Sequence, residues 1–110
     1  MPKAAAPRID AHEMRSHADE AARLLKALAN EKRLLLLCQL VEGERSVGEL
    51  NANVDLSQSA LSQHLAVLRE DGLVSTRREA QTIFYSLSPG PAQRILETLH
   101  GIFCDDGPLC

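Results

Sequence analysis

The sequence predicts a mainly helical fold that carries one β-hairpin near its C-terminal end. Three observations support this fold class. Apolar residues recur at helical spacing over most of the 110 residues, and only 3% of residues are aromatic, so an aliphatic core between helices is expected. Good capping residues precede the expected helices. Two short runs near residue 80 alternate between apolar and polar residues, as strands do.

The length fits one domain. Residues 1–10 contain two prolines and an alanine run, and we expect them to form a disordered arm. The folded domain then spans residues 11–104, and residues 105–110 form a C-terminal tail. No apolar run reaches the roughly 20 residues of a membrane span, and no signal-peptide pattern precedes the first helix. We therefore expect a cytoplasmic protein without a membrane partner.

The first helix is expected from about Ala11 to Ala29. Small and apolar residues with coiled-coil-like spacing form a seam along it: Met14, Ala18, Ala21, Leu25 and Leu28. The seam could face the domain's own core, but we favour a subunit interface. A small helical domain also gains by covering leftover apolar surface through dimerisation.

The second helix is expected between Asn30, a good N-cap, and Gly43, a favoured residue just beyond a helix. Residues 33–41 are apolar nearly all round, which places this helix centrally. Four consecutive leucines could also form a buried strand, but leucine favours helix and the caps agree.

The third and fourth helices are predicted to form a helix-turn-helix. Ser46 and Glu49 match a capping box, which starts a short helix ending near Val54. Ser57 then caps a longer helix, and Leu56 before it can pack on a leucine one turn later. Three leucines point at the core: Leu61, Leu65 and Leu68.

A second face of this fourth helix is small, polar and uncharged, and it contains Ser59, Ser62, Gln63 and Ala66. Solvated helix faces normally carry Lys and Glu. Short hydroxyl and amide side chains allow close approach to base edges, and glutamine can pair with adenine. An ordinary amphipathic helix with a serine-rich surface is the alternative. A short helix, a turn and a longer helix of this kind favour DNA recognition.

Two strand-like runs follow Gly72, at Leu73–Arg78 and Ile83–Leu87, joined by a short loop that lacks the usual glycine. Arg77 and Arg78 are expected at the hairpin tip, next to Arg69 at the end of the fourth helix. Such a positive cluster suggests a wing that contacts DNA phosphates or the minor groove. A solvated arginine pair is the alternative.

The last helix is expected to be capped by Ser88, with Pro89 at its first position and Cys104 at its end. Its wide apolar stripe is a second candidate for a dimer surface and comprises Ala92, Ile95, Leu96, Leu99, Ile102 and Phe103. The complete order is four helices, a hairpin and a fifth helix. This order predicts a winged helix-turn-helix that forms a homodimer.

The composition limits the function further. A net charge of −3 is not typical of a non-specific nucleic-acid binder, so any DNA contact needs a local basic patch. The mild negative charge also leaves open a winged helix used for protein–protein contact. An odd count of three cysteines argues against a disulfide framework and leaves metal, redox or inert roles. We find no catalytic arrangement and do not expect an enzyme.

From about Leu24 to Cys104 the chain resembles the ArsR–SmtB family of repressors. The resemblance is carried by the segments 28–34, 57–65, 68–74, 77–79 and 84–87. It implies a homodimer that binds an inverted-repeat operator in double-stranded DNA, with the fourth helix in the major groove and the hairpin as wing. The residues that we expect at the DNA are Ser57, Gln58, Ser59, Ser62, Gln63, His64, Arg69, Arg77 and Arg78.

Many members of this family sense metals, but the ligands implied by that resemblance are mostly missing here. Asn51 and Asn53 stand where arsenic and cadmium sensors carry cysteines. At the four zinc-ligand positions the chain has Pro89, Pro91, Ile102 and Asp105. The His12, Glu13 and His17 cluster lacks a metal-binding spacing. We therefore predict no metal site and no cofactor, and we expect His100 to be a surface residue.

Cys38 on the second helix and Cys104 at the end of the last resemble the sulfide- and persulfide-responsive branch of the family (BigR, SqrR and HlyU-like regulators). That resemblance implies a disulfide or polysulfide link between them, formed by reactive sulfur species such as persulfides, which releases DNA. A cysteine in a leucine-rich helix is otherwise usually an inert hydrophobe. Two aspartates after Cys104 should slow its attack, and Cys110 is a bystander or a competing thiol.

The sequence thus predicts a thiol-based transcriptional repressor switched by Cys38 and Cys104. A metal-responsive or general oxidant-responsive repressor of the same family is the alternative.

Overall fold

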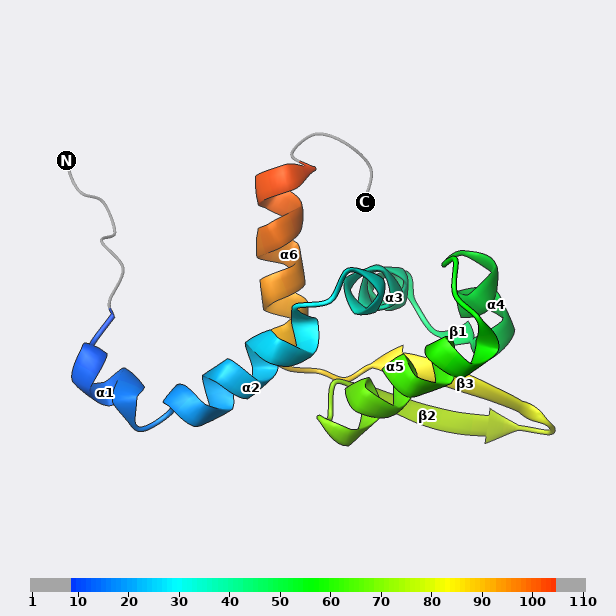
Figure 1. Ribbon diagram of the computed structural model, residues 1–110, viewed down its shortest axis with the longest axis horizontal. Helices are drawn as coiled ribbons and strands as arrows, with labels where there is room; N and C mark the ends of the chain where they lie inside the picture. Colours follow the sequence, from blue (N-terminus) through cyan, green and yellow to red (C-terminus); the bar gives the residue numbers. More distant parts are fainter. Residues whose placement is uncertain (1–8, 105–110) are drawn as a thin grey trace.

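The computed structural model describes residues 9–104 and confirms a winged helix-turn-helix (Figure 1). In this range the chain extends over 54 × 35 × 23 Å. Its elements are α1 (Ala11–Arg15), α2 (Ala18–Leu28), α3 (Glu31–Glu42), β1 (Arg45–Ser46), α4 (Val47–Ala52), α5 (Gln58–Glu70), β2 (Val74–Glu79), β3 (Thr82–Leu87) and α6 (Pro91–Phe103). The tail at 105–110 and most of the predicted arm, residues 1–8, lie outside the described residues.

The first predicted helix is divided into α1 and α2, so the described chain has six helices where five were expected. Asp10, which we had placed in the arm, caps α1 by accepting from the backbone N–H groups of His12 and Glu13. The break comes at Ser16, whose hydroxyl donates to the carbonyl of Glu13 at 2.8 Å. A serine that bonds its own backbone competes with a continuous helix. Helix α1 and the first part of α2 reach away from the rest of the domain, whereas the C-terminal end of α2 packs in the core (Figure 1).

Helix α3 is the central element, as its all-round apolar sequence predicts. The Asn30 side chain accepts from the N–H groups of Lys32 and Arg33 at 3.0 Å each, and Gly43 ends the helix with a φ of +150°. Its fully buried leucines, Leu36 and Leu37, belong to a core to which α2, α4, α5, α6 and the sheet also contribute. The core contains tyrosine as its one aromatic residue among the described positions.

Helices α4 and α5 form the predicted helix-turn-helix. The capping box at the start of α4 is present: Ser46 Oγ accepts from Glu49 N–H at 3.1 Å, and Glu49 Oε1 accepts from Ser46 N–H at 2.8 Å. Ser57 Oγ accepts from Ala60 N–H at 3.2 Å and starts α5. The three leucines predicted to anchor α5 are all buried: Leu61, Leu65 and Leu68.

Both strands of the hairpin extend one residue further toward the turn than the sequence suggested, and the first strand begins one residue later. The hairpin belongs to a sheet of three strands. Strand β3 lies in the middle, with β2 on one side and the two-residue β1 on the other, all antiparallel. The connecting residues are Ala80 and Gln81, and Ala80 has a φ of +57°. Strand β1 is too short for any alternation of residues to reveal it.

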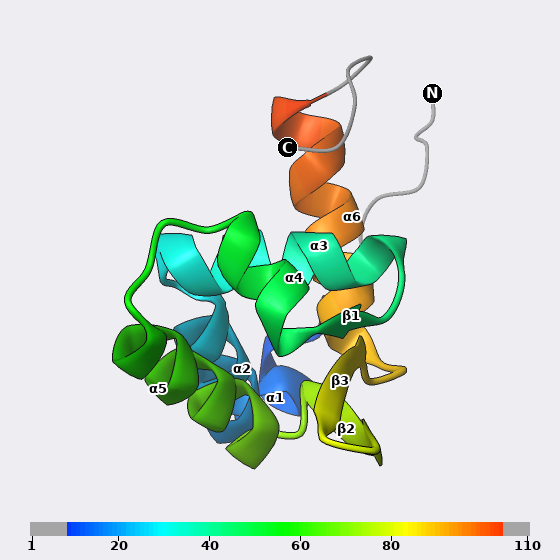
Figure 2. The same cartoon turned by 90° about the vertical axis from the view of Figure 1, so that its right-hand side faces the viewer.

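The start of the last helix was predicted two residues too early. Gly90 is its N-cap and Pro91 its first residue, whereas Ser88 directly follows β3, and its N–H donates to the carbonyl of Leu73 at 2.9 Å. Proline suits the first helical position at either site, so the sequence signal fits both. Cys104 ends the helix as expected. Figure 2 shows α6 standing clear of the helix-turn-helix and the sheet at its C-terminal end.

Candidate DNA-binding surface and thiol site

The predicted DNA-contacting face of α5 is exposed. Its solvent-facing residues are Ser57, Gln58, Ser59, Ser62 and Gln63, followed by Ala66. The buried leucines on the opposite side hold the helix against the core, so this face is fixed in orientation without any polar contact of its own to α3. Arg69 and Glu70 bring the first charges, in the last turn of the helix. An uncharged face of short side chains suits close approach to base edges.

His64, which we had placed at the DNA, faces the protein instead. Its Nδ1 lies 3.4 Å from Nη1 of Arg33, and the ring is half-buried. Arg33 also donates from Nε to the carbonyl of Ala27 at 2.6 Å and from Nη2 to the carbonyl of Lys26 at 3.2 Å. Burial of the ring and the charge of Arg33 lower the pKa of His64. We therefore assign His64 to the support of α5.

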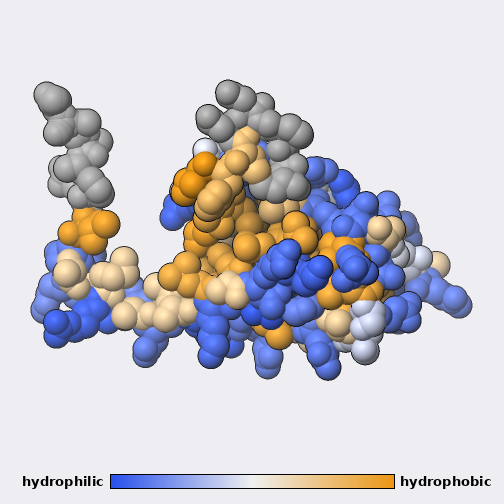
Figure 3. Space-filling view, turned by 45° about the horizontal axis from the view of Figure 1, so that its top comes forward, coloured by the Kyte–Doolittle hydropathy of each residue, from blue (hydrophilic) through white to orange (hydrophobic). Residues whose placement is uncertain are grey.

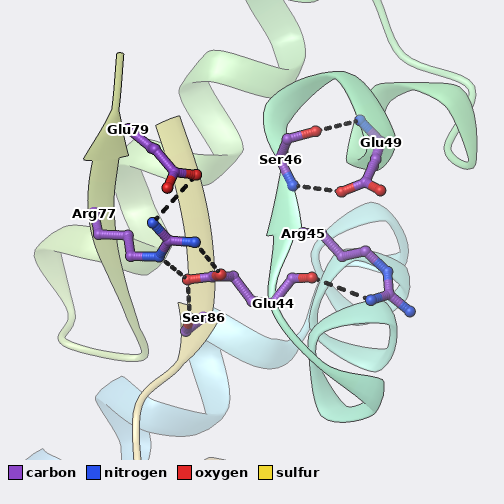
Figure 4. A network of polar contacts seen from close by, with 7 residues as sticks. All are labelled: Glu44, Arg45, Ser46, Glu49, Arg77, Glu79 and Ser86. Carbon is purple, nitrogen blue, oxygen red and sulfur yellow. Dashed lines mark hydrogen bonds and ion pairs between the residues drawn. The ribbon is translucent and has the colours of Figure 1, made fainter. Parts of the chain in front are cut away.

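The wing contains a polar network that the sequence did not suggest (Figure 4). Arg77 Nε and Nη2 donate to the two carboxylate oxygens of Glu44, at 2.8 Å each, and Ser86 Oγ donates to the same carboxylate at 3.3 Å. Arg77 Nη1 lies 3.7 Å from Glu79 Oε1, and the guanidinium carbon lies 4.5 Å from the centre of the Phe84 ring. Hydrogen bonding to Arg77 lowers the pKa of Glu44.

The predicted cluster of three arginines is therefore not formed as we expected. Arg77 is neutralised within the protein, and Arg69 lies where α5 leads into the base of β2, whereas Arg78 lies near the far end of that strand (Figure 1). Arg78 lies four residues along the strand from Val74, a distance of about 13 Å. Arg78 is exposed and has no ion pair within residues 9–104. The freely exposed cation of the wing is thus Arg78.

Cys38 carries a free thiol on the side of α3 that faces α6. It lies in the wall of an apolar cavity of about 510 Å³ between the two helices, which is also lined by Leu34, Leu35, Leu96, Leu99 and Phe103. Burial, and secondarily the charge of Glu42, raise the pKa of the Cys38 thiol. Cys104, next to Phe103, is disulfide-bonded and half-buried. Because Cys38 is free, the structure does not contain the predicted Cys38–Cys104 link, and Cys110 lies outside the described residues.

His100 is a residue whose position the sequence reading missed. We expected a surface histidine, but it is half-buried and lines both cavities that border Cys38. Its Nε2 is buried without a hydrogen-bond partner among the described residues. Its spacing of four residues from Leu96 on the inner side of α6 could have indicated this, because residues four apart share a helix face.

Apolar side chains gather on the surface around α6 and the helices beside it (Figure 3). At the end of α6 the side chains of Ile102 and Phe103 are 62% and 77% exposed, and on α2 Leu25 is 56% exposed. Leu28, which we had also placed in the subunit seam, is buried in the domain's own core. The exposed apolar residues of α2 and α6 are thus accessible to a partner.

Between residues 9 and 104, no three His, Cys, Asp or Glu side chains are grouped closely enough to hold a metal ion. No helix in the same part of the chain has the length and apolar character needed to cross a membrane.

The chain is similar to the transcriptional activator HlyU of Vibrio cholerae. The two are 56% identical over 92 residues, which cover 84% of this chain and 85% of HlyU. Residues 30–76 also match the family model for bacterial regulatory proteins of the arsR family. The chain belongs to the ArsR family. The solved structure of reduced HlyU has a TM-score of 0.79 and covers 84% of this ArsR-family chain and 98% of its own.

A second relative of this ArsR-family protein is the biofilm growth-associated repressor BigR of Xylella fastidiosa, 47% identical with a TM-score of 0.82, covering 87% of this chain and 98% of BigR. A homodimeric winged helix-turn-helix DNA-binding domain from Mycobacterium bovis is 28% identical with a TM-score of 0.73, covering 87% of this chain and 89% of that domain. The protein is accordingly a transcriptional regulator with a DNA-binding fold, and not an enzyme.

Proposed function

We propose that this regulator is a repressor that binds an inverted-repeat operator as a homodimer and releases it when Cys38 and Cys104 become linked. The observation that carries the sensing half is the position of Cys38. Its free thiol borders an apolar cavity between α3 and α6, and Phe103, the residue before Cys104, borders the same cavity. A link between these cysteines would join the central helix to the end of the last one.

The DNA-binding half rests on the exposed, uncharged face of α5. Ser59, Ser62 and Gln63 are proposed to contact base edges, while Ser57, Gln58, Arg69 and Arg78 contact phosphates. The two-fold symmetry of a homodimer would bring two such helices to successive major grooves, roughly 34 Å apart. The exposed apolar residues of α2 and α6 are the proposed dimer surface, and a homodimeric relative supports this arrangement.

The proposed chemistry starts from the form in which both cysteines are thiols. The Cys38 thiolate attacks the terminal sulfur of a persulfide RSSH, which releases the thiol RSH and leaves a persulfide on Cys38. The Cys104 thiolate then attacks the Cys38 sulfur and releases hydrogen sulfide, leaving a disulfide. The two cysteines lose two electrons, and the transferred sulfur is reduced to sulfide. Transfer of additional sulfur atoms before closure would give a polysulfide link.

Thermodynamic linkage between the state of the cysteines and DNA binding sets the requirement for DNA release. Only a difference in DNA affinity between the dithiol and linked forms can drive release, and a coupling of a few kcal/mol is sufficient. A link that changes the spacing of the two α5 helices would weaken both half-sites together. The raised pKa of Cys38 makes its thiolate scarce at neutral pH, so a reaction by way of Cys38 should accelerate as the pH rises.

The test compares reduced wild type with Cys38→Ala, and with Cys110→Ala as the matched control. DNA release from a labelled duplex taken upstream of its own coding sequence is followed after adding a persulfide donor, peroxide, zinc or arsenite. We expect all three proteins to bind, and only Cys38→Ala to remain bound after persulfide. Mass spectrometry of the intact protein identifies the joined cysteines and the number of sulfur atoms. Normal release from Cys38→Ala, or release by metal alone, would contradict the proposal.

A further inference from the structure

The Arg77 side chain is held from three sides within the protein. Glu44 takes the Nε and Nη2 edges in a bidentate pair at 2.8 Å, Glu79 lies 3.7 Å from Nη1, and the face of the guanidinium lies on the Phe84 ring. Bidentate pairs of this kind are the stronger and more directional ion pairs. One cation therefore faces two carboxylates, and this part of the wing has a local net charge of −1.

The network joins the outer strand of the wing to the body of the domain. Arg77 lies on β2, Ser86 on the middle strand β3, and Glu44 on the turn between α3 and β1 (Figure 4). In the sheet, β2 pairs with β3 and not with β1, because β3 lies between those two strands. The Glu44 carboxylate thus bridges across the sheet and links β2 to the end of the central helix.

Transfer of Arg77 from Glu44 to a DNA phosphate would be costly. It would leave the Glu44 and Glu79 carboxylates without their cation beside a polyanion, where like charges repel. Within the described part of the chain Arg78 has no carboxylate partner, so a contact between Arg78 and a phosphate would leave no carboxylate there without its cation. It is exposed and shares its strand face with Val74 and Thr76, opposite to the face that carries Arg77.

We propose that Arg77 is a positioning residue, held by Glu44 in the bound and free states, and that Arg78 is the wing residue that contacts phosphate. This inference rests on the proposed binding of DNA by the wing. It separates two adjacent arginines that the sequence does not distinguish, and it gives Glu44 a function in orienting the wing.

The deciding measurement is the slope of log Kd against log salt concentration for the labelled upstream duplex. Each lost phosphate contact reduces the slope by about 0.9. We expect Arg78→Gln to reduce it by about 0.9 per wing. The charge-balanced double variant Glu44→Gln/Arg77→Gln should keep the wild-type slope while its Kd rises several-fold at every salt concentration. The inference is overturned if the salt slope of the double variant is reduced as much as that of Arg78→Gln. It is also overturned if Arg78→Gln keeps the wild-type salt slope.

A second measurement needs no DNA. Hydrogen exchange of the hairpin amides, residues 74–87, should be faster in the double variant than in wild type and unchanged in Arg78→Gln. Equal exchange in all three proteins would show that the Glu44–Arg77 pair does not hold the wing, and would overturn the positioning role. A wild type that fails to bind the duplex, with faster exchange in the double variant, would instead refute the proposed function and leave the structural role of the pair established.

Discussion

Arg33 of α3 lies against His64 of α5, with 3.4 Å between Nη1 and Nδ1, while its other nitrogens donate to the last carbonyls of α2. One side chain thus joins three helices: the helix proposed for dimerisation, the central helix and the helix that faces DNA. A guanidinium suits this place because its fork of donors can satisfy carbonyls and an imidazole at once.

The first prediction concerns Arg33→Ala. Loss of its bonds to the carbonyls of Ala27 and Lys26 should lower the free energy of unfolding by about 1.5–3 kcal/mol, as for hydrogen bonds to charged groups. Urea denaturation at one fixed protein concentration measures it, because a dimer's stability depends on concentration. Arg15→Ala, on an exposed position of α1, is the control and should change the value by less than about 0.5 kcal/mol.

The second prediction is a pH dependence due to His64, whose folded-state pKa is lowered from 6.5 by burial and by Arg33. The unfolded chain then takes up the proton at a higher pH than the folded one, so the neutral ring favours folding above pH 6.5. This contribution is lost as the pH falls through the folded pKa. The free energy of unfolding of wild type minus that of His64→Gln should be constant above neutrality. It should decrease at lower pH, where wild type loses the contribution of its neutral ring.

The ring titration of His64 by NMR checks the cause directly. In Arg33→Ala the positive neighbour is gone, so the pKa of His64 should move up toward its ordinary value. An unchanged titration in that variant would leave burial as the one cause.

The third prediction concerns the hairpin turn. Ala80 has a φ of +57°, a left-handed conformation that costs an L-residue roughly 1–2 kcal/mol and glycine very little. Ala80→Gly should therefore raise the free energy of unfolding by about 1 kcal/mol after the greater freedom of unfolded glycine is subtracted. Gln81→Gly, at the neighbouring turn residue without a positive φ, is the matched control and should not stabilise.

The fourth prediction tests the exposed face of α5. If Gln63 pairs with a base, Gln63→Ala should weaken operator binding by about 1–3 kcal/mol while the salt slope stays unchanged. Gln93→Ala on α6, another exposed glutamine, should leave the affinity at the wild-type value. Unchanged affinity in Gln63→Ala would remove this residue from the base contacts.

Much of the fold could be predicted because local signals and burial agree. Asn30, Ser46 and Ser57 cap the helices that the sequence assigned to them, and the leucines of α5 are buried as their spacing requires. The exposed serine and glutamine face follows from the same periodicity. Such signals act within one turn of helix, so a single sequence reveals them.

The differences come from contacts between distant residues. Glu44 and Arg77 are 33 residues apart, and Arg33 and His64 are 31 apart, so no spacing rule could pair them. The same applies to Ser88, whose N–H pairs with the carbonyl of Leu73, 15 residues away, while α6 begins after Gly90. The cavity that brings Cys38 near His100 likewise depends on how α3 and α6 cross.

Cys38 and Arg33 lie on the same helix, five residues apart, which is about 7.5 Å along its axis. The thiol proposed to receive the chemical signal and the side chain that fixes the DNA-facing helix are therefore parts of one rigid rod. A tilt or rotation of α3 imposed at the sulfur end is transmitted to Arg33 without an intervening loop or a relay of side chains. Sensing and release in this protein would then require one element to move, with the remainder of each subunit following it.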